Sequence, residues 1–216
     1  DIRKTLIKFD NVLNDQRQVV FSQRKDAMDS EKIFDYSDNF LSEIVDNLIS
    51  LKIQKLSNPK NNEFNNKLKA IFGKSLNDDE YDELISLSDQ KLREKIFEKF
   101  KFAREERSKI LGENQSKEIE KRILLQSIDF NWKSHIQYLE QLRQVVGLRS
   151  YGQRDPLIEY KKEAFDLFSN LLIKLKLDYI TVLMNLKIVE QPEEKIDKKK
   201  ESEILNNPKC LLILKK

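Results

Sequence analysis

The residue types that most often carry chemistry are scarce in this sequence. Its 216 residues include one histidine, His135, and one cysteine, Cys210. No glycine-rich phosphate loop of the GxxxxGK type is present, so the chain offers no cradle for a nucleotide. A structural zinc site needs about four thiolate or imidazole ligands, which these two residues cannot supply. We therefore expect no catalysis, no bound nucleotide and no tightly bound zinc in this chain alone.

His135 follows Trp132 by three positions on an apolar stripe. A lone histidine in such a place either satisfies its hydrogen bonds in a core or interface, or acts as a general base. The apolar setting favours the first interpretation. The 37 acidic residues are spread along the chain, and no pair stands out for acid–base work. The sequence thus predicts a structural histidine without a catalytic site.

Residues suited to contact gather between positions 147 and 162. Two of the four glycines, Gly147 and Gly152, stand there. Basic, acidic and exposed apolar or aromatic candidates surround them: Arg149, Arg154, Lys161, Lys162, Asp155, Glu159, Leu148 and Tyr151. One interpretation is an ordinary solvated helical turn. The other is a contact surface for an unfolded chain, because the ring of Tyr151 packs on almost any side chain and tolerates water.

The elements that would position these residues are long helices. With 36% charged residues but only 4 glycines and 4 prolines, the chain has little material for tight turns, which indicates an all-α fold. An apolar stripe at spacings of four and three predicts a first long helix to about residue 28, with Ile2, Leu6, Phe9, Leu13, Gln16 and Val20.

Two further apolar stripes predict a long antiparallel hairpin. The outgoing stripe is Ile128, Trp132, His135, Leu139, Leu142 and Val146. The return stripe is Phe165, Phe168, Leu172, Leu175, Tyr179, Val182 and Leu186. Asp155 is the expected N-cap of the return helix, with Pro156 at its first position. Trp132 and Phe168 are expected to be buried between the two arms.

The segment between these long helices predicts four shorter ones. The first carries Leu41, Ile44, Val45, Leu48 and Ile49 and breaks at Asn58-Pro59. The second carries Phe64, Leu68, Ile71 and Phe72 and stops at Gly73. Asn77 and Glu80 form a possible capping box for a third. The fourth carries Leu92, Ile96, Phe100 and Ala103. The pattern fades after residue 190, which predicts a flexible tail.

Several ordered stretches resemble the helical scaffold and wing region at the C-terminal end of the SecA preprotein translocase ATPases. DIRK (1–4), FDNV (9–12), NDQR (14–17) and SQR (22–24) resemble that family's long scaffold helix. LLQSID (124–129) and WKSH (132–135) resemble its LQ-x-[IL]-D-x-x-W-K-x-H pattern. LRSYGQRDP (148–156), followed by EYKK (159–162), resembles LR-x-Y-x-Q-[KR]-DP-x-x-EYK. The segment between them matches only in position and helical character.

This resemblance implies a domain plan and a function. The plan is a scaffold helix (1–36), a helical wing domain (37–112), the scaffold's two-helix finger (113–190) and a flexible tail (191–216). The function is the mechanical part of an ATP-driven bacterial protein translocase. ATP and Mg²⁺ would belong to the intact protein. NNPKC (206–210) resembles the start of the family's zinc tail, but only Cys210 remains of the motif, so zinc is not expected.

The resemblance also implies contact residues and partners. The fingertip, expected to contact preprotein or channel, is Leu148, Arg149, Tyr151, Gly152, Gln153 and Arg154. The scaffold-helix residues expected to couple to the motor are Arg3, Asp10, Asn14, Gln16, Arg17 and Arg24. The implied partners are an unfolded preprotein, a SecYEG-type channel and the same protein's nucleotide-binding domains, with a homodimer of the intact protein as a further implied assembly. The implied location is the bacterial cytoplasm, peripherally at the inner membrane.

Two other classes of protein compete with this reading. A structural scaffold or coiled-coil adaptor would share the long helices and contact no substrate. A nucleic-acid binder would show a stronger basic bias than the net charge of +3, so no nucleic-acid partner is expected. No apolar run approaches the roughly 18–20 residues that a membrane span needs.

Overall fold

The computed structural model describes residues 2–28, 30–57, 62–73, 78–148 and 155–186, and it is all-helical over these ranges. The elements in chain order are α1 (Ile2–Ala27), the short 3₁₀ helix η1 (Ser30–Lys32), α2 (Ile33–Ser57), α3 (Glu63–Phe72), α4 (Asp78–Ser86), α5 (Asp89–Leu111), α6 (Glu113–Val146) and α7 (Pro156–Asn185). The predicted all-α class is therefore confirmed. None of these helices is long and apolar enough to cross a membrane.

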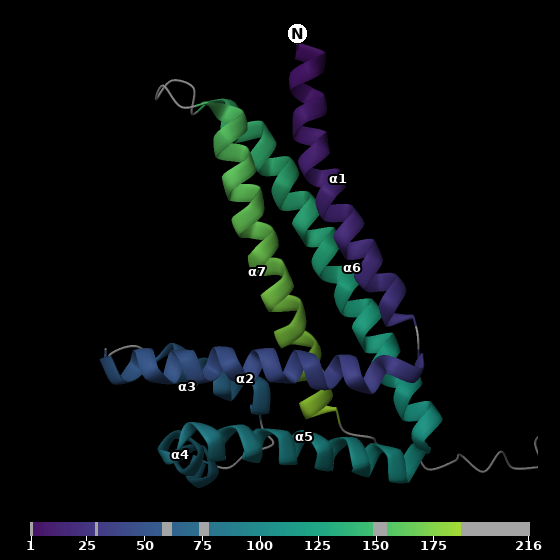
Figure 1. Ribbon diagram of the computed structural model, residues 1–216, viewed down its shortest axis with the longest axis vertical. Helices are drawn as coiled ribbons and strands as arrows, with labels where there is room; N and C mark the ends of the chain where they lie inside the picture. The colour runs from purple at the N-terminus through teal and green to yellow at the C-terminus, as the bar shows by residue number, and fades with distance from the viewer. Residues whose placement is uncertain (1, 29, 58–61, 74–77, 149–154, 187–216) are drawn as a thin grey trace, which may run out of the picture. The chain divides into compact units, whose positions relative to one another are not determined.

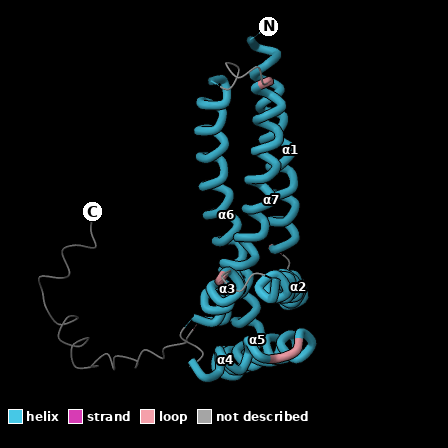
Figure 2. The backbone as a smooth tube through the Cα atoms, turned by 90° about the vertical axis from the view of Figure 1, so that its left-hand side faces the viewer, coloured by secondary structure: helices cyan, strands magenta, loops and turns pink. Residues whose placement is uncertain are grey.

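Three long helices, α1, α6 and α7, lie side by side (Figures 1 and 2). α6 and α7 form the predicted hairpin, and α1 packs along both. The start of α7 is as expected. The Asp155 carboxylate accepts a hydrogen bond from the Leu157 amide at 2.8 Å, and Pro156 occupies the first turn. This cap satisfies one of the free amides at the helix N-terminus.

The buried face of α7 shares only Leu175 and Tyr179 with the expected stripe, and two stripe positions are exposed. Phe165 and Val182 are 68% and 43% exposed, whereas Ala164 and Leu183 are fully buried. α7 carries apolar residues around much of its circumference, so the sequence does not mark one face. Packing selects the face with Ala164, because a small side chain there lets α1 approach the α7 backbone.

Trp132 and Phe168 are only partly buried, so the expectation that both are enclosed between the arms is wrong. Their rings flank the ring of His135 at centroid distances of 5.6 and 5.7 Å. The hairpin has only α1 on one side, so its other side leaves part of each ring in contact with solvent.

This partial burial sets the expected cost of truncation. Because large-to-small changes at fully buried aromatic residues cost about 3–5 kcal/mol, we expect Trp132→Ala to lower the free energy of unfolding by about 2 kcal/mol. Tyr138→Ala is the control on the same helix, since Tyr138 is 60% exposed. That change is expected to cost less than about 0.5 kcal/mol. Urea unfolding followed by circular dichroism measures both, and equal costs would contradict this assignment.

The helices of the middle segment cross the base of the hairpin (Figure 1). α2 is one helix of 25 residues, longer than the short helix expected from its apolar stripe. α3 ends at Gly73 as predicted. Gly73 has φ +52°, and a Cβ there would lie 2.5 Å from Asn185 Oδ1. Of the possible capping box before α4, Asn77 lies outside the described residues.

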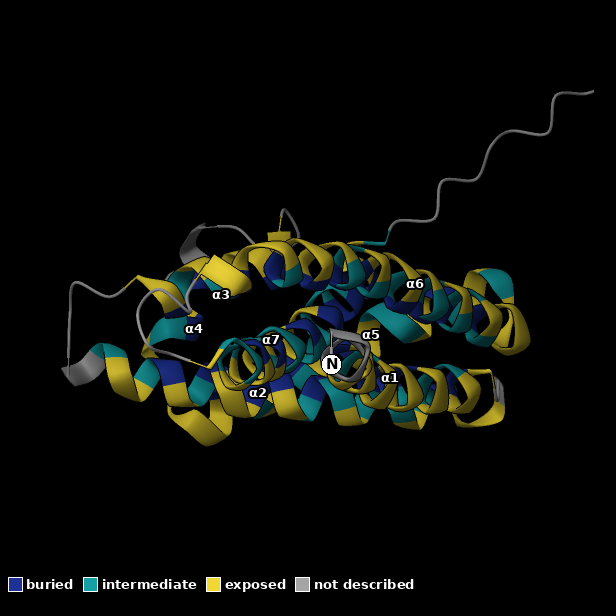
Figure 3. Ribbon diagram, turned by 90° about the horizontal axis from the view of Figure 1, so that it is seen from above, coloured by how far each residue is buried: buried dark blue, intermediate teal, exposed yellow. Residues whose placement is uncertain are grey.

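One hydrophobic cluster joins this segment to the long helices. It contains Leu41 and Leu48 of α2, Phe72 of α3, Phe100 of α5 and Tyr179 of α7. Figure 3 shows the buried positions on the sides of the helices that face one another. Nearer the tip of the hairpin, a smaller cluster packs around an edge-to-face contact between Phe9 and Tyr160 at 4.8 Å. The proposed boundaries at 36, 112 and 190 stay predictions.

Candidate functional site

Gln16 ties the scaffold helix to both arms of the hairpin. Its side chain is 8% exposed. The Gln16 amide nitrogen donates to the Ala164 carbonyl on α7 at 3.0 Å, and its Oε1 lies 2.7 Å from His135 Nε2 on α6. Because an amide oxygen only accepts, His135 carries a proton on Nε2. One side chain of α1 therefore fixes the positions of α6 and α7 together.

His135 is a structural histidine, as its sequence position indicated. It is 4% exposed and lies between the rings of Trp132 and Phe168. Burial lowers the pKa of His135 to about 4 from its ordinary 6.5, because the imidazolium would lose its hydration. At neutral pH the ring is uncharged and serves as a hydrogen-bond donor to Gln16.

The lowered pKa of His135 predicts a specific loss of stability in acid. The unfolded chain takes up a proton near pH 6.5, whereas the folded chain does so only near pH 4. Protonation thus favours the unfolded state across this range, and we expect the free energy of unfolding to fall by about 1–3 kcal/mol between these two pH values. His135→Gln removes this titration. Urea unfolding at several pH values should show a shallower pH dependence in the variant; parallel curves would contradict the prediction.

Other scaffold-helix residues expected to act in coupling divide into two groups. Arg24 forms a bidentate pair with Asp129 of α6 at 2.9 and 3.3 Å, and Asp10 pairs with Arg143 at 3.2 Å. Asn14 and Arg17 are exposed, and the side chain of Arg3 lies outside the described residues. Asp10, Gln16 and Arg24 therefore contact the hairpin. Coupling of α1 to a motor stays a prediction.

The predicted fingertip is described only at its first residue. Leu148 lies two residues after Val146, the last residue of α6, and is 66% exposed. The remaining fingertip candidates, Arg149, Tyr151, Gly152, Gln153 and Arg154, lie outside the described residues. Val145 on α6 and Ile158 on α7 are 50% and 64% exposed near the same end of the hairpin. Large apolar side chains thus face solvent on both helices at this end of the hairpin.

A buried polar cluster, which the sequence interpretation missed, lies where four helices meet. Its residues are Ser37, Arg104, Arg107, Glu120 and Tyr179, with the partly exposed Asp38 at its edge. The acidic residues are spread along the sequence and none stood out, yet Glu120 is fully buried. A signal was present: Arg107 continues the spacing of Leu92, Ile96 and Phe100, and Glu120 precedes Leu124 by one turn. Charges in register with an apolar stripe indicate buried charges.

The Glu120 carboxylate is the centre of this cluster. It accepts hydrogen bonds from Arg107 Nη2 at 2.9 Å, from Arg104 Nε at 3.2 Å and from Ser37 Oγ at 2.7 Å. Ser37 has one proton, and the carboxylate is the strongest acceptor in reach. Tyr179 therefore donates to Ser37 Oγ, at 2.6 Å. Burial, with the nearby charge of Glu120, raises the pKa of the Tyr179 hydroxyl, so it stays protonated.

The described residues supply no group of three or more side chains suited to hold a metal ion. Cys210 lies outside them, so the expected absence of zinc stays a prediction. Two hollows of about 420 and 550 Å³ lie in the described part of the chain, the first lined by α2, α3 and α7 and the second by α6 and α7. The features that define this region are an extended hairpin, a clamp at Gln16 and a buried polar joint.

These features define an all-helical scaffold with a clamped two-helix hairpin and a helical segment across its base. The family model of the SecA wing and scaffold domain matches residues 1–187, and the chain belongs to this family. It is 64% identical over its whole length to a protein translocase subunit SecA of Pelagibacter ubique, covering 25% of that protein.

More distant relatives show the same partial coverage. A protein translocase subunit SecA of Caulobacter vibrioides is 36% identical over 89% of this chain, which covers 21% of the relative. One of Bartonella bacilliformis is 35% identical over 90% of this chain, which covers 22% of the relative. The chain spans about a quarter of the length of these proteins.

Proposed function

We propose that this chain is the wing and scaffold part of a bacterial Sec-pathway translocase, and that its hairpin tip contacts the moving preprotein or the channel mouth. Membership in the SecA wing and scaffold family and the relatives' description as protein translocase subunits support the pathway. ATP and Mg²⁺ would act in the motor domains of the intact protein. The chain would work in the cytoplasm, peripherally at the inner membrane, against a SecYEG-type channel.

One observation carries the contact role: apolar side chains are exposed at the free end of a hairpin that α1 braces. Leu148, Val145 and Ile158 face solvent there. The hairpin behind them is clamped to α1 through Gln16 and through the Arg24–Asp129 pair. An apolar tip can pack on many different side chains. Together with a hairpin held in place by α1, it suits force transfer to an unfolded chain. The same clamp would connect α1, and through it the motor domains, to the tip.

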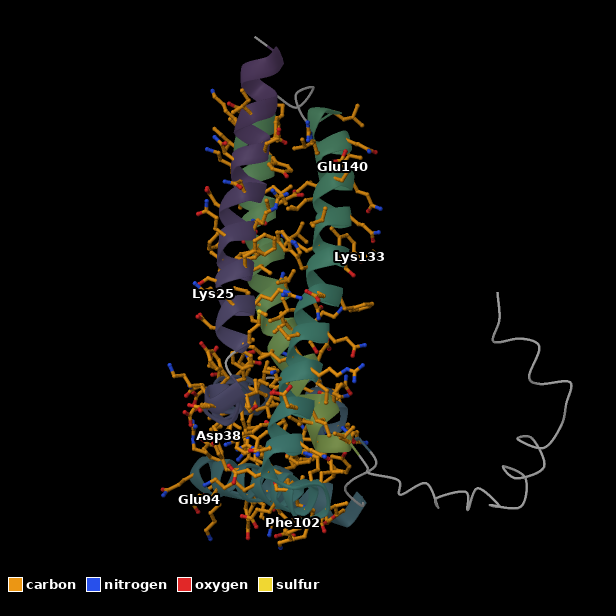
Figure 4. The ribbon with its side chains drawn as sticks, turned by 90° about the vertical axis from the view of Figure 1, so that its right-hand side faces the viewer. Lys25, Asp38, Glu94, Phe102, Lys133 and Glu140 are labelled. Atoms are coloured by element: carbon orange, nitrogen blue, oxygen red, sulfur yellow. The ribbon has the colours of Figure 1, made fainter. Side chains whose placement is uncertain are left out.

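Site-directed photo-crosslinking tests this contact. A photoreactive residue at Leu148 in a full-length family protein should crosslink to a preprotein or channel subunit during transport. Phe102 on α5 is the matched control, because it is also apolar and 58% exposed but lies on the opposite end of the molecule's described part (Figure 4). Equal crosslinking at both positions, or none at Leu148, would contradict the proposal.

The second candidate is a structural scaffold that contacts no substrate. The buried cluster and the Gln16 clamp support this function as much as the contact role, because a passive scaffold needs the same contacts between helices. A pull-down of this chain with an unfolded preprotein segment separates the two functions. Retention by the chain that is lost on Leu148→Ser supports contact, and no retention supports the passive scaffold.

A further inference from the structure

The link between α5 and α6 does not by itself fix the angle between these helices. Gly112 alone separates them, with φ +85° and ψ 154°. A Cβ at this position would meet no atom within 4 Å, so no neighbouring group presses on the turn. Glycine is permissive in both halves of φ space. The direction of α5 must therefore be held by contacts made elsewhere along the helix.

The last turns of α5 are held mainly by charged groups. Arg107 donates to Glu120 on α6 and to the Leu183 carbonyl on α7, at 2.9 and 2.8 Å. Arg104 reaches Glu120 and also donates to Asp38 on α2 at 2.9 Å. The Arg104 guanidinium lies over the Phe34 ring at 4.4 Å. Two arginines of one helix thus engage three other helices.

Such a cluster is a poor means of adding stability. A buried ion group is often no better than apolar side chains of similar volume, because desolvation offsets the attraction. Among the described residues, two buried polar atoms beside it, Arg107 Nε and Ser116 Oγ, have no hydrogen-bond partner. A hydrogen-bonded charge cluster instead fixes the relative orientation of the helices that carry it, because hydrogen bonds weaken steeply away from their preferred angles. Apolar packing has no preferred direction.

We propose that the buried polar cluster is an orienting joint, which fixes the direction of α5, and of the wing segment it carries, relative to the α6–α7 hairpin. Arg104, Arg107 and Glu120 are positioning residues in this joint. Ser37 donates to the second oxygen of the Glu120 carboxylate, and Tyr179 in turn donates to Ser37 Oγ. The inference depends on the contacts within this chain alone and does not rest on the proposed function.

Distance measurements between spin labels test the joint in this chain. Glu94 on α5 and Lys133 on α6 are exposed and point outward, so labels there report the angle between wing and hairpin (Figure 4). Both positions become cysteine in a Cys210→Ser background. The test variant is Glu120→Leu with Arg107→Met, which replaces both charges with apolar volume. We expect a helical, cooperatively unfolding chain with a distance distribution about twofold broader, because several orientations become similar in free energy.

Leu84→Ala is the matched control, because it opens a cavity in α4, away from the joint. Leu84→Ala should lower the melting temperature and leave the distance distribution as in the parent. Glu120→Gln is the second test variant, and it keeps the side-chain shape. It should also broaden the distance distribution, and it provides the test if the double variant does not fold. A parental distribution in the folded double variant or in Glu120→Gln would overturn the proposal. Equal broadening in Leu84→Ala would also overturn it.

Discussion

Glu120→Ala is expected to lower the free energy of unfolding of this chain by about 3–5 kcal/mol, the usual cost of leaving a buried charge without its partner. Arg107 is 3% exposed and would keep only the Leu183 carbonyl as an acceptor. Arg104 would lose one of its carboxylates but keep Asp38. Ser37 and Tyr179 would lose the acceptor at the end of their hydrogen-bonded chain. Urea unfolding followed by circular dichroism measures the change.

Asp129→Asn is the control for this prediction. It weakens the Arg24–Asp129 pair, whose side chains are 39% and 57% exposed. Exposed ion pairs contribute about 0–1 kcal/mol, so the control should unfold close to the parent. Similar losses in the two variants would show that Glu120 is solvated. A cost below about 1 kcal/mol for Glu120→Ala would lead to the same conclusion.

The sequence predicts the long elements of this fold well, because each repeats one physical signal many times. The stripe through Phe9, Gln16 and Val20 places α1 correctly, and these residues are buried. Asp155-Pro156 marks the start of α7, since cap chemistry is local. His135 is structural, as its position beside Trp132 indicated.

Other features depend on tertiary packing, and no local sequence pattern predicts them. α7 has apolar residues on several faces, so only contact with α1 decides that Ala164 is buried and Phe165 exposed. Glu120 looks like a surface carboxylate until Arg104 and Arg107 arrive from another helix. Gln16 stood on the predicted stripe, but its two partners are 119 and 148 positions away. Pairings over such separations need the fold itself.

Tyr151→Ala in a full-length family protein is expected to reduce preprotein translocation sharply and leave the fold unchanged. Tyr151 is a predicted fingertip residue and lies outside the described part of the chain. Its sequence neighbours Arg149, Gly152 and Arg154 belong to neither apolar stripe. A loop residue without a core to fill adds little to folding. If its ring grips a moving chain, activity should follow the contact area of the side chain rather than its hydroxyl.

The series Tyr151→Phe, →Leu, →Ala and →Gly tests the contact role of the hairpin most directly. Translocation of a preprotein and the melting temperature are measured for each variant in the full-length protein. We predict parental melting temperatures throughout, near-parental translocation for Phe, intermediate activity for Leu, and strong loss for Ala and Gly. Parental translocation in all four variants would contradict the proposed fingertip and leave the passive scaffold as the function of this chain.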